Sequence, residues 1–478
     1  MDTKKLRQKI LDLAIRGKLV PQDPNDEPAS VLLERIRAEK ERLIKEGKIK
    51  RSKKSASDTP HYENVPFEVP KGWISCRFER ICSKFSTGPF GSMVHKADYV
   101  SVGGVPIINP MNIVAGDILH DNLMMVSNEK AQKLSRYRLS VDDILIARRG
   151  DLKKCAIVKE TVVDWLCGTG SFFLHVPYVE PRYIQLFYLS EYVQTILSKE
   201  CVGATMDNLN QSVLGAIPFL LPPQKEQRRI INEVDKWFSL IDTLETAKED
   251  LQTSIAQAKS KILNLAIHGK LVPQDPNDEP AIELLKRINP SFVPCDNAHD
   301  TNQLPNSWCW TTLGSLFQHN TGKALNKSDS QEGLLKPYLT TSNVYWNCFD
   351  FTEVKEMYFK DSELEKCTVT KGDLLVCEGG DIGRAAIWNY DYGICIQNHI
   401  HRLRAKGDVC QILYLYVLML YKWKDRIHGK GIGLQGLSSG LLDKLIVPLP
   451  PYNEQRRIVT KIEELFAVLD EIQKSIEA

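Results

Sequence analysis

The sequence predicts two α/β (α+β) domains in a pseudo-two-fold arrangement, joined by long antiparallel coiled-coil helices. Three observations support this fold class. Two short strings recur almost unchanged along the chain, which is the mark of an internal repeat. The stretch Pro223–Ile267 has the apolar spacing of one long helix. Between the recurring strings, strand-like runs alternate with glycine-rich turns.

The composition is that of an ordinary globular chain. Its 478 residues are 43% hydrophobic and 26% charged, with a net charge of +2, so any contact with nucleic acid must come from local basic surface. No apolar stretch approaches the ~20 residues that span a bilayer. The first residues lack the apolar core of a signal peptide. We therefore expect a cytoplasmic protein that does not bind a membrane.

The first recurring string is GKLVPQDPNDEPA, which occupies both Gly17–Ala29 and Gly269–Ala281, 252 residues apart. The second is LPPQKEQRRI at Leu221–Ile230, which returns 228 residues later as LPPYNEQRRI at Leu449–Ile458. The segments between the strings are related only faintly. This contrast indicates that the helical parts bind the same partner twice, while the two variable segments bind two different targets. Slow drift of helical linkers is the alternative.

The central helix is expected to begin at the prolines before Gln224 and to end near Gly269, because proline favours a helix start and glycine a helix end. A helix of this length needs a partner along its apolar seam. The seam has the 4-3-4-3 spacing of a coiled coil, in the order Leu251, Ile255, Ala258, Ile262 and Leu265.

The two repeat offsets make the N-terminal helix Met1–Ile15 and the C-terminal helix Pro451–Ala478 equivalent to the two parts of the central helix. We therefore expect Met1 and Ala478 to lie close together in space. The N-terminal helix should pack on the central coiled coil through Leu6, Ile10 and Leu13, and should cover part of the seam, including Leu251, Ile255 and Ile262.

The predicted domain boundaries follow from these repeats. The first segment (1–59) holds an N-terminal helix, a repeat loop and a basic helical arm. It is followed in order by the first variable domain (60–222), the central helix with its repeat loop (223–288), the second variable domain (289–450) and the C-terminal helix (451–478). Strands are expected within Val105–Asn109, Asp143–Ala147, Ser171–Val176 and Asp373–Cys377, and helices within Ile184–Leu197 and Cys410–Ile427.

The order of variable domain, helix, variable domain and helix resembles the specificity (S) subunits of type I restriction–modification systems. The recurring strings, GPFGS at Gly88–Ser92, and the turns RGDLKKCAI and GGDIGRAAI carry the resemblance. It implies two target recognition domains, each recognising one half of a split, asymmetric DNA sequence, with the helices setting the spacing between the half-sites. The implied partners are double-stranded DNA, two modification (methyltransferase) subunits and restriction subunits. S-adenosylmethionine, ATP and Mg are expected in those partner subunits, and no cofactor in this chain.

The catalytic motifs that the chain partly matches are incomplete, which favours a non-catalytic chain. GIGLQG at Gly431–Gly436 fits G-x-G-x-x-G but lacks a βαβ context. LPPY places Leu449 where an amino-methyltransferase motif has Asn or Asp. We therefore expect no catalytic residue and no bound metal. His399 and His401 alternate on a probable strand; two such histidines can ligate a metal, but a strand that faces DNA or solvent is favoured.

Base edges are recognised by side chains that present paired donors and acceptors. In the first domain the favoured residues are Ser92, Lys96, Asn112, Arg148, Arg149, Lys153, Lys154, Asn208, Asn210 and Gln211. In the second they are Lys323, Lys327, Thr340, Thr341, Ser342, Asn343, Arg384, Gln397, Asn398 and Gln435. Neighbouring glycines would let the backbone approach the duplex, namely Gly88, Gly91, Gly150, Gly379 and Gly380. For any single residue, an ordinary polar loop is the alternative.

Two further interpretations stay open at this point. The main alternative is a scaffold that binds two copies of a protein partner and no specific DNA; a standalone methyltransferase or nuclease is disfavoured because its motifs are missing. The basic segment Glu34–Lys54 has no counterpart in the second copy. It either contacts phosphates or forms a solvated helix.

Overall fold

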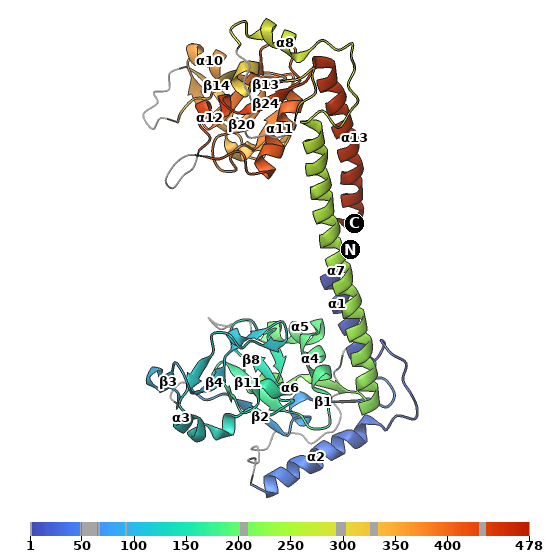
Figure 1. Ribbon diagram of the computed structural model, residues 1–478. Coiled ribbons are helices and arrows are strands. Elements are labelled where there is room, and N and C mark those ends of the chain that lie inside the picture. The colour runs from blue at the N-terminus through green and yellow to red at the C-terminus, as the bar shows by residue number, and fades with distance from the viewer. Residues whose placement is uncertain are drawn as a thin grey trace. The chain divides into compact units, whose positions relative to one another are not determined.

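The computed structural model describes residues 2–47, 49, 65, 67–90, 93–200, 209–292, 303–325, 333–429 and 436–477. The chain forms two compact units (Figure 1), which we call the first unit (residues 2–247) and the second unit (residues 248–478). The boundary between them falls inside helix α7 (Gln224–Ala266), which was predicted at Pro223–Ile267. Each unit therefore includes one part of this helix.

The first unit contains two four-stranded sheets. One is antiparallel, in the order β2-β11-β8-β9, with bounds Lys84–Thr87, Ser171–His175, Ile144–Ala147 and Cys155–Ile157. The other has the order β10-β4-β7-β3, with bounds Leu166–Cys167, Val105–Ile108, Met124–Val126 and Tyr99–Val100. The other described strands of the first unit form two pairs: β1 (Ile74–Arg77) with β12 (Pro218–Leu221), and β5 (Ile113–Val114) with β6 (Asp117–Ile118). The helices are α1 (Thr3–Ile15), α2 (Ala29–Lys45), α3 (Asn128–Lys133), α4 (Pro181–Leu189), α5 (Glu191–Glu200) and α6 (Gln211–Ala216).

Strand β8 lies between two cores, which explains why its four residues ILIA are all apolar. Successive side chains of a strand point to opposite faces. Ile144 and Ile146 pack in the core that contains α4, whereas Leu145 packs in the core that contains β4 and β10. The first unit therefore has its antiparallel sheet in the middle, between a helical layer and the second sheet.

The second unit repeats this architecture. Its antiparallel sheet has the order β14-β23-β20-β21, with bounds Phe317–Thr321, Ile400–Ala405, Leu374–Cys377 and Ala385–Ile387. The other sheet has the order β18-β15-β22-β19, with bounds Lys355–Phe359, Leu334–Leu339, Ile394–Ile396 and Thr368–Val369. Two pairs, β13 (Cys309–Thr312) with β24 (Ile446–Leu449) and β16 (Val344–Tyr345) with β17 (Cys348–Phe349), match those of the first unit. The helices are α8 (Ala281–Ile288), α9 (Leu313–Leu316), α10 (Asp361–Cys367), α11 (Gln411–Trp423), α12 (Ser439–Asp443) and α13 (Tyr452–Glu477).

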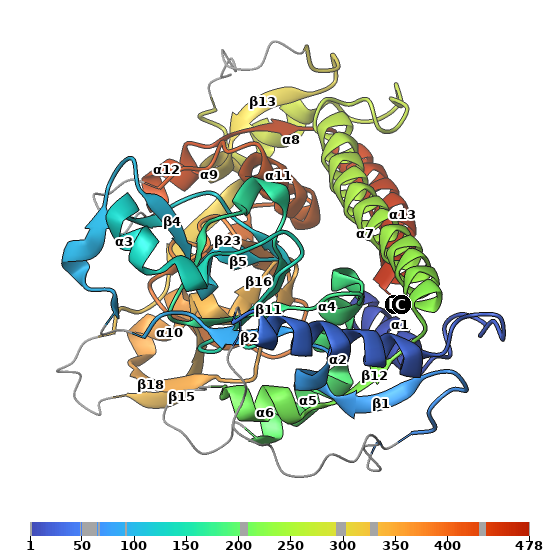
Figure 2. The same cartoon turned by 90° about the horizontal axis from the view of Figure 1, so that it is seen from below.

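Each part of α7 pairs with one helix of its own unit in antiparallel fashion (Figures 1 and 2). In the first unit, Ile10 and Leu11 of α1 share a core with Ile230 and Ile241 of α7. In the second unit, Ile458 and Ile462 of α13 share a core with Leu263 and Ala266 of α7. The predicted coiled-coil helices are thus present as two short antiparallel pairs.

The pairing corrects the expectation that α1 covers Leu251 and Ile262; Ile255 is buried, and its cover by α1 stays a prediction. Leu251 is exposed at 41%, and Ile262 packs on the core that contains α13. The reason is the antiparallel direction: α1 is the counterpart of the second part of α7, so it lies opposite the first part. Leu6 and Ile10 do pack there, but Leu13 is only half-buried. Residues Met1 and Ala478 lie outside the described residues, so their proximity stays a prediction.

Two predicted helices also differ from the structure. The helix expected at Ile184–Leu197 is two helices, α4 and α5, separated at Ser190, whose hydroxyl donates to the Phe187 carbonyl and accepts from the Val193 amide. Such a capping bond favours a new helix start. The helix expected at Cys410–Ile427 ends at Trp423. In the described part of the chain, no helix is both long and apolar enough to cross a membrane.

Candidate nucleic-acid interface

The two repeated strings contact each other inside the first unit. The Gln22 side chain donates to the Gly17 carbonyl at 2.6 Å and to the Glu226 carboxylate at 3.2 Å. Arg229 pairs with Asp26 at 2.6 Å. Gly17 has a φ of +63°, and a Cβ there would lie 2.5 Å from the Cγ of Pro70, so only glycine fits. The loop is therefore held against the start of α7.

The second unit makes the same contacts with the second copy of each string. Gln274 donates to Gly269 and Glu454, and Arg457 pairs with Asp278 at 2.6 Å. Glu226 and Glu454 are both buried. Burial raises the pKa of each carboxyl, and their hydrogen bonds lower it in part. The near-identity of the strings is thus explained in part by internal contacts, without an external partner.

In the first unit, three segments far apart in sequence meet beside the end of β8; we call them the first recognition edge. They are the turn Arg148–Lys154, the 3-10 turn Pro110–Asn112 and the start of α6. Lys154 donates to the Pro110 carbonyl at 2.9 Å, and the Leu209 amide donates to the Arg148 carbonyl at 2.8 Å. These bonds join the three segments into one surface.

The exposed side chains of this edge are polar or charged, apart from Met111. Arg149, Lys153, Asn210 and Gln211 are exposed. Arg148 lies over the Phe172 ring at 5.6 Å, and burial, followed by the charge of Arg149, lowers the pKa of Arg148. Guanidinium stays protonated in proteins. The edge thus presents donors suited to phosphates and to base edges.

The second unit has an equivalent second recognition edge, made of the turn Glu378–Arg384, the 3-10 turn Thr341–Asn343, Gln397–Asn398 and Leu437. Arg384 donates to the Thr341 carbonyl at 2.6 Å and lies over the Tyr345 ring at 4.5 Å. The Leu437 amide donates to the Glu378 carbonyl at 2.8 Å. The bonds are equivalent to those of the first edge, but the turn carries Glu378 and Gly379 where the first carries Arg148 and Arg149.

Several predicted recognition residues have a structural role instead, which corrects their assignment. Asn112 and Asn343 are both 3% exposed. Their Oδ1 atoms accept from the backbone of Asn109 at 3.0 Å and Thr340 at 2.8 Å, so they close the 3-10 turns. Lys323 donates to the Tyr358 carbonyl at 2.8 Å and pairs with Glu363 at 3.0 Å. These three side chains are used inside the protein.

One predicted glycine is also structural. A Cβ on Gly88 would lie 1.9 Å from the Gly168 carbonyl oxygen, so this glycine permits close backbone contact within the unit and not with a duplex. Gly150 and Gly380, by contrast, have φ of +72° and +71° in the two edge turns. Gly379 has open space on its outer side.

The remaining predicted residues fall into two groups. Lys96 is exposed before β3, Ser342 is exposed, and Thr340, Thr341, Gln397 and Asn398 are half-buried at the second edge. Ser92, Asn208, Lys327, Gln435 and Gly91 lie outside the described residues.

Two further exposed residues lie at these edges: Met111 was not predicted, whereas His399 was expected on a strand that faces DNA or solvent. Met111, at the tip of the first 3-10 turn, is 64% exposed. His399 lies at the second edge, 3.5 Å from the Glu378 carboxylate. His401 is fully buried, so the prediction of a histidine strand facing DNA or solvent is wrong for that residue. The sequence could have indicated an exposed Met111 through its position between Pro110 and Asn112, which belong to the same turn.

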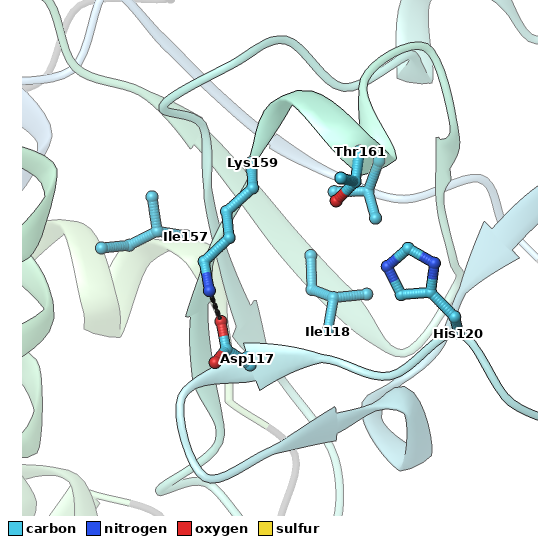
Figure 3. A pocket seen from close by; sticks show the side chains of 7 residues that line it. Asp117, Ile118, His120, Ile157, Lys159 and Thr161 are labelled. Atoms are coloured by element: carbon cyan, nitrogen blue, oxygen red, sulfur yellow. Dashed lines mark ion pairs between the residues drawn. The ribbon is translucent and has the colours of Figure 1, made fainter.

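A small cavity of about 240 Å³ lies beside β6 and β9 in the first unit. Figure 3 shows Lys159 directed at Asp117, with which it forms an ion pair, and His120 on the other side of Ile118. The corresponding region of the second unit is filled by an aromatic cluster made of Phe349, Phe351, Trp388, Tyr390 and Tyr392. The two units thus differ in side chains where their backbones agree.

The profile of the type I restriction modification DNA specificity domain matches residues 86–253 and 305–478. The chain belongs to this family. Each match contains one recognition edge, so the two units of this type I specificity subunit are its two DNA-recognition domains.

Relatives that align with nearly the whole chain are also type I specificity subunits. The subunit is 28% identical to the type I restriction enzyme EcoAI specificity subunit of Escherichia coli, over 98% of this chain and 90% of the relative. It is 26% identical to the EcoEI specificity subunit of Escherichia coli, over 99% and 91%. The HsdS subunit from Thermoanaerobacter tengcongensis shares the fold, with a TM-score of 0.52 and 19% identity over 85% of this chain and 93% of that one. A chain from a study of type I R-M complex assembly has a TM-score of 0.59, with 18% identity over 86% and 94%.

Proposed function

We propose that this specificity subunit recognises a bipartite, asymmetric DNA site, with one half-site for each unit. The observation that carries the proposal is the pair of recognition edges. Their backbone bonds are equivalent, yet the first edge turn holds Arg148 and Arg149 where the second holds Glu378 and Gly379. Two edges with the same backbone arrangement and different side chains suit the recognition of two different half-sites. Family membership favours this function over a scaffold that binds no specific DNA.

We further propose that two modification subunits dock on the helices. On the outer face of α7, Trp237, Leu240 and Leu244 are exposed at 40%, 49% and 44%. The equivalent positions of α13 are Leu465, Val468 and Ile472, and the last two are also exposed. A repeated exposed apolar stripe is what a partner that binds twice would use. These stripes, and not the buried Glu226 and Glu454, are the docking surfaces we assign.

In this proposal the chain itself is not catalytic. S-adenosylmethionine, ATP and Mg belong to the modification and restriction subunits, and the helices of the specificity subunit set the spacing between the half-sites. The assembled complex acts on DNA in the cytoplasm. Arg149, Lys153, Asn210 and Gln211 at the first edge and Ser342, Arg384, Gln397 and Asn398 at the second are the described candidates for DNA contact.

The experiment that tests the proposal is duplex binding by the chain assembled with its modification subunits. Affinity for a duplex that carries both half-sites should fall steeply with salt, because phosphate contacts release counterions. Duplexes with one half-site scrambled should bind more weakly by about 10³-fold or more. Equal affinity for scrambled and intact duplexes would favour the scaffold instead.

A further inference from the structure

A loop of small residues lies against the first recognition edge. Residues 168–170 read Gly-Thr-Gly and follow β10. The Gly168 amide donates to the Ile108 carbonyl at 2.8 Å, and the Gly170 carbonyl accepts from the Arg148 amide at 2.9 Å. These bonds hold the loop, which we call the glycine loop, between the end of β4 and the start of the edge turn.

Two exposed apolar side chains border the glycine loop. A Cβ on Gly170 would lie 2.9 Å from Cδ of Pro110, and the next residue, Met111, is 64% exposed. A Cβ on Gly88 would lie 1.9 Å from a carbonyl oxygen of the loop, and Phe90 is 59% exposed. A single exposed apolar side chain needs no explanation, but these two follow residues that touch the same loop.

The backbone on both sides of Met111 is fixed. Oδ1 of Asn112 accepts from the Asn109 amide at 3.0 Å, and Lys154 donates to the Pro110 carbonyl at 2.9 Å. Only the Met111 side chain is left to be ordered when a partner binds, so the loss of conformational entropy on binding is small. This position therefore suits a residue that contacts another molecule.

In the second unit, polar residues take the place of the glycine loop. The Gln397 amide donates to the Leu339 carbonyl at 3.0 Å, and the His399 carbonyl accepts from the Glu378 amide at 2.9 Å. These two bonds are equivalent to those of the glycine loop. With Asn398 between them, the segment presents hydrogen-bonding side chains where the first edge has a glycine at each end.

The tips of the two 3-10 turns differ in the same sense. Ser342 of the second unit occupies the position of Met111, and its hydroxyl lies 2.7 Å from that of Thr340. The second edge keeps an apolar side chain shortly after its own close backbone approach at Gly322, because Leu325 is 58% exposed. At the tip of the turn, however, the first edge has a thioether side chain and the second edge has a hydroxyl.

The major groove of DNA presents a group that an apolar side chain can recognise. Base edges there carry donors and acceptors, and thymine adds its C5-methyl group. The flexible, polarisable side chain of methionine adapts to such a contact. Arg149 and Lys153, exposed at the same edge, match the charge of the phosphates. These features favour a thymine methyl of double-stranded DNA as the group that Met111 contacts.

We propose that Met111 is a specificity-determining residue of the first recognition edge and contacts the C5-methyl group of a thymine in one half-site. The inference rests on the proposed function and adds to it the chemical group that this side chain recognises. The contact should strengthen binding by about fourfold over the same base without its methyl, the scale of one buried apolar carbon.

The test uses the chain assembled with its modification subunits and duplexes in which single thymines are replaced by deoxyuridine. This replacement removes the methyl and keeps the donors and acceptors of the base. For the wild type, deoxyuridine at a thymine of one half-site should weaken binding by about fourfold. In Met111→Ser, which introduces the residue type of the second edge, the thymine and deoxyuridine duplexes should bind equally at that position. Met111→Leu should keep the difference, because its side chain is still apolar.

Val102→Ser is the matched control. Val102 is 85% exposed in the same unit and precedes β4, whereas the recognition edge follows this strand, so the control should respond to deoxyuridine as the wild type does. A wild type that discriminates sequences but binds every deoxyuridine duplex as tightly as its thymine counterpart would overturn the inference and leave the proposed function standing. A deoxyuridine effect that is unchanged in Met111→Ser at every thymine would do the same. Failure of the wild type to discriminate any sequence would overturn both.

Discussion

The Arg7 guanidinium lies 2.6 Å from the Asp242 carboxylate and over the Phe238 ring at 5.1 Å. Lys259 repeats this arrangement in the second unit, pairing with Asp470 and lying over Phe466 at 5.4 Å. Under the two repeat offsets, Arg7 corresponds to Lys259 and Asp242 to Asp470. Each unit thus joins a piece of one helical copy to a piece of the other by the same pair of contacts.

We predict that α1 is required for the stability of the first unit and not of the second. Replacing the buried Ile10 with Ala should lower the free energy of unfolding by about 2–4 kcal/mol, because a large apolar side chain leaves a cavity in the core. Arg7→Ala should lower the free energy of unfolding by less than about 1 kcal/mol, because the partner carboxylates of Asp242 and Glu245 are exposed to solvent. Denaturant unfolding of the full chain measures both. An Ile10→Ala change that destabilised the second unit's transition instead would contradict the pairing.

The Asp143–His175 pair should make the stability of the first unit depend on pH. The hydrogen bond to Asp143 raises the pKa of His175 above its ordinary 6.5. The stabilisation is present in full below pH 6.5 and is lost as pH rises through the raised pKa. At the equivalent position of the second unit, Arg404 pairs with Asp373. The Arg404 guanidinium stays charged over this pH range. His175→Arg should therefore flatten the unfolding profile between pH 6 and 9; an unchanged slope in that variant would count against the pair.

The exposed stripes should each bind one modification subunit. Leu240→Glu with Leu244→Glu should leave a complex with one modification subunit per chain, and Val468→Glu with Ile472→Glu should do the same for the other copy. A charge buried in an apolar interface is costly. Light scattering of the reconstituted complex gives the mass, with the exposed Lys236→Ala on the same helix as a matched control. Two subunits bound in both double variants would show that the stripes are not the docking surfaces.

The buried and exposed residues of the first edge should respond differently to substitution. Arg149→Ala should weaken duplex binding and reduce its salt dependence, because an exposed cation at the edge is removed. Asn112→Ala should lower stability by about 1–2 kcal/mol, the usual effect of losing a side-chain cap, and leave the recognised sequence unchanged. Binding titrations at two salt concentrations and thermal unfolding separate the outcomes. Altered base preference in Asn112→Ala would return this residue to the interface.

The helical frame was predictable because its signals are local. The repeated strings and the coiled-coil spacing predicted the bounds of α7 to within one residue at each end. All four expected strands are present. The helix partner was not predictable in the same way, since the choice between the two parts of α7 depends on an antiparallel direction that no local pattern specifies. The sequence therefore assigned Leu251 and Ile262 to the wrong contact.

The candidate site was harder to predict for a related reason. Asn112 and Asn343 have the residue type of a base reader, and only their burial shows that they close turns. His401 was placed on a strand, but its partners His319 and Asp443 are distant in sequence. Composition suggests which residues can bind DNA, whereas tertiary packing decides which of them are free to do so.

The most direct test of independent recognition by the two units is to exchange residues 60–221 for the equivalent segment of a relative that has another target. The complex assembled with this hybrid chain is expressed in cells, and the methylated genomic sites are mapped. Independent recognition predicts that one half of the bipartite site changes while the other half stays as it was. A change in both halves, or in neither, would contradict it.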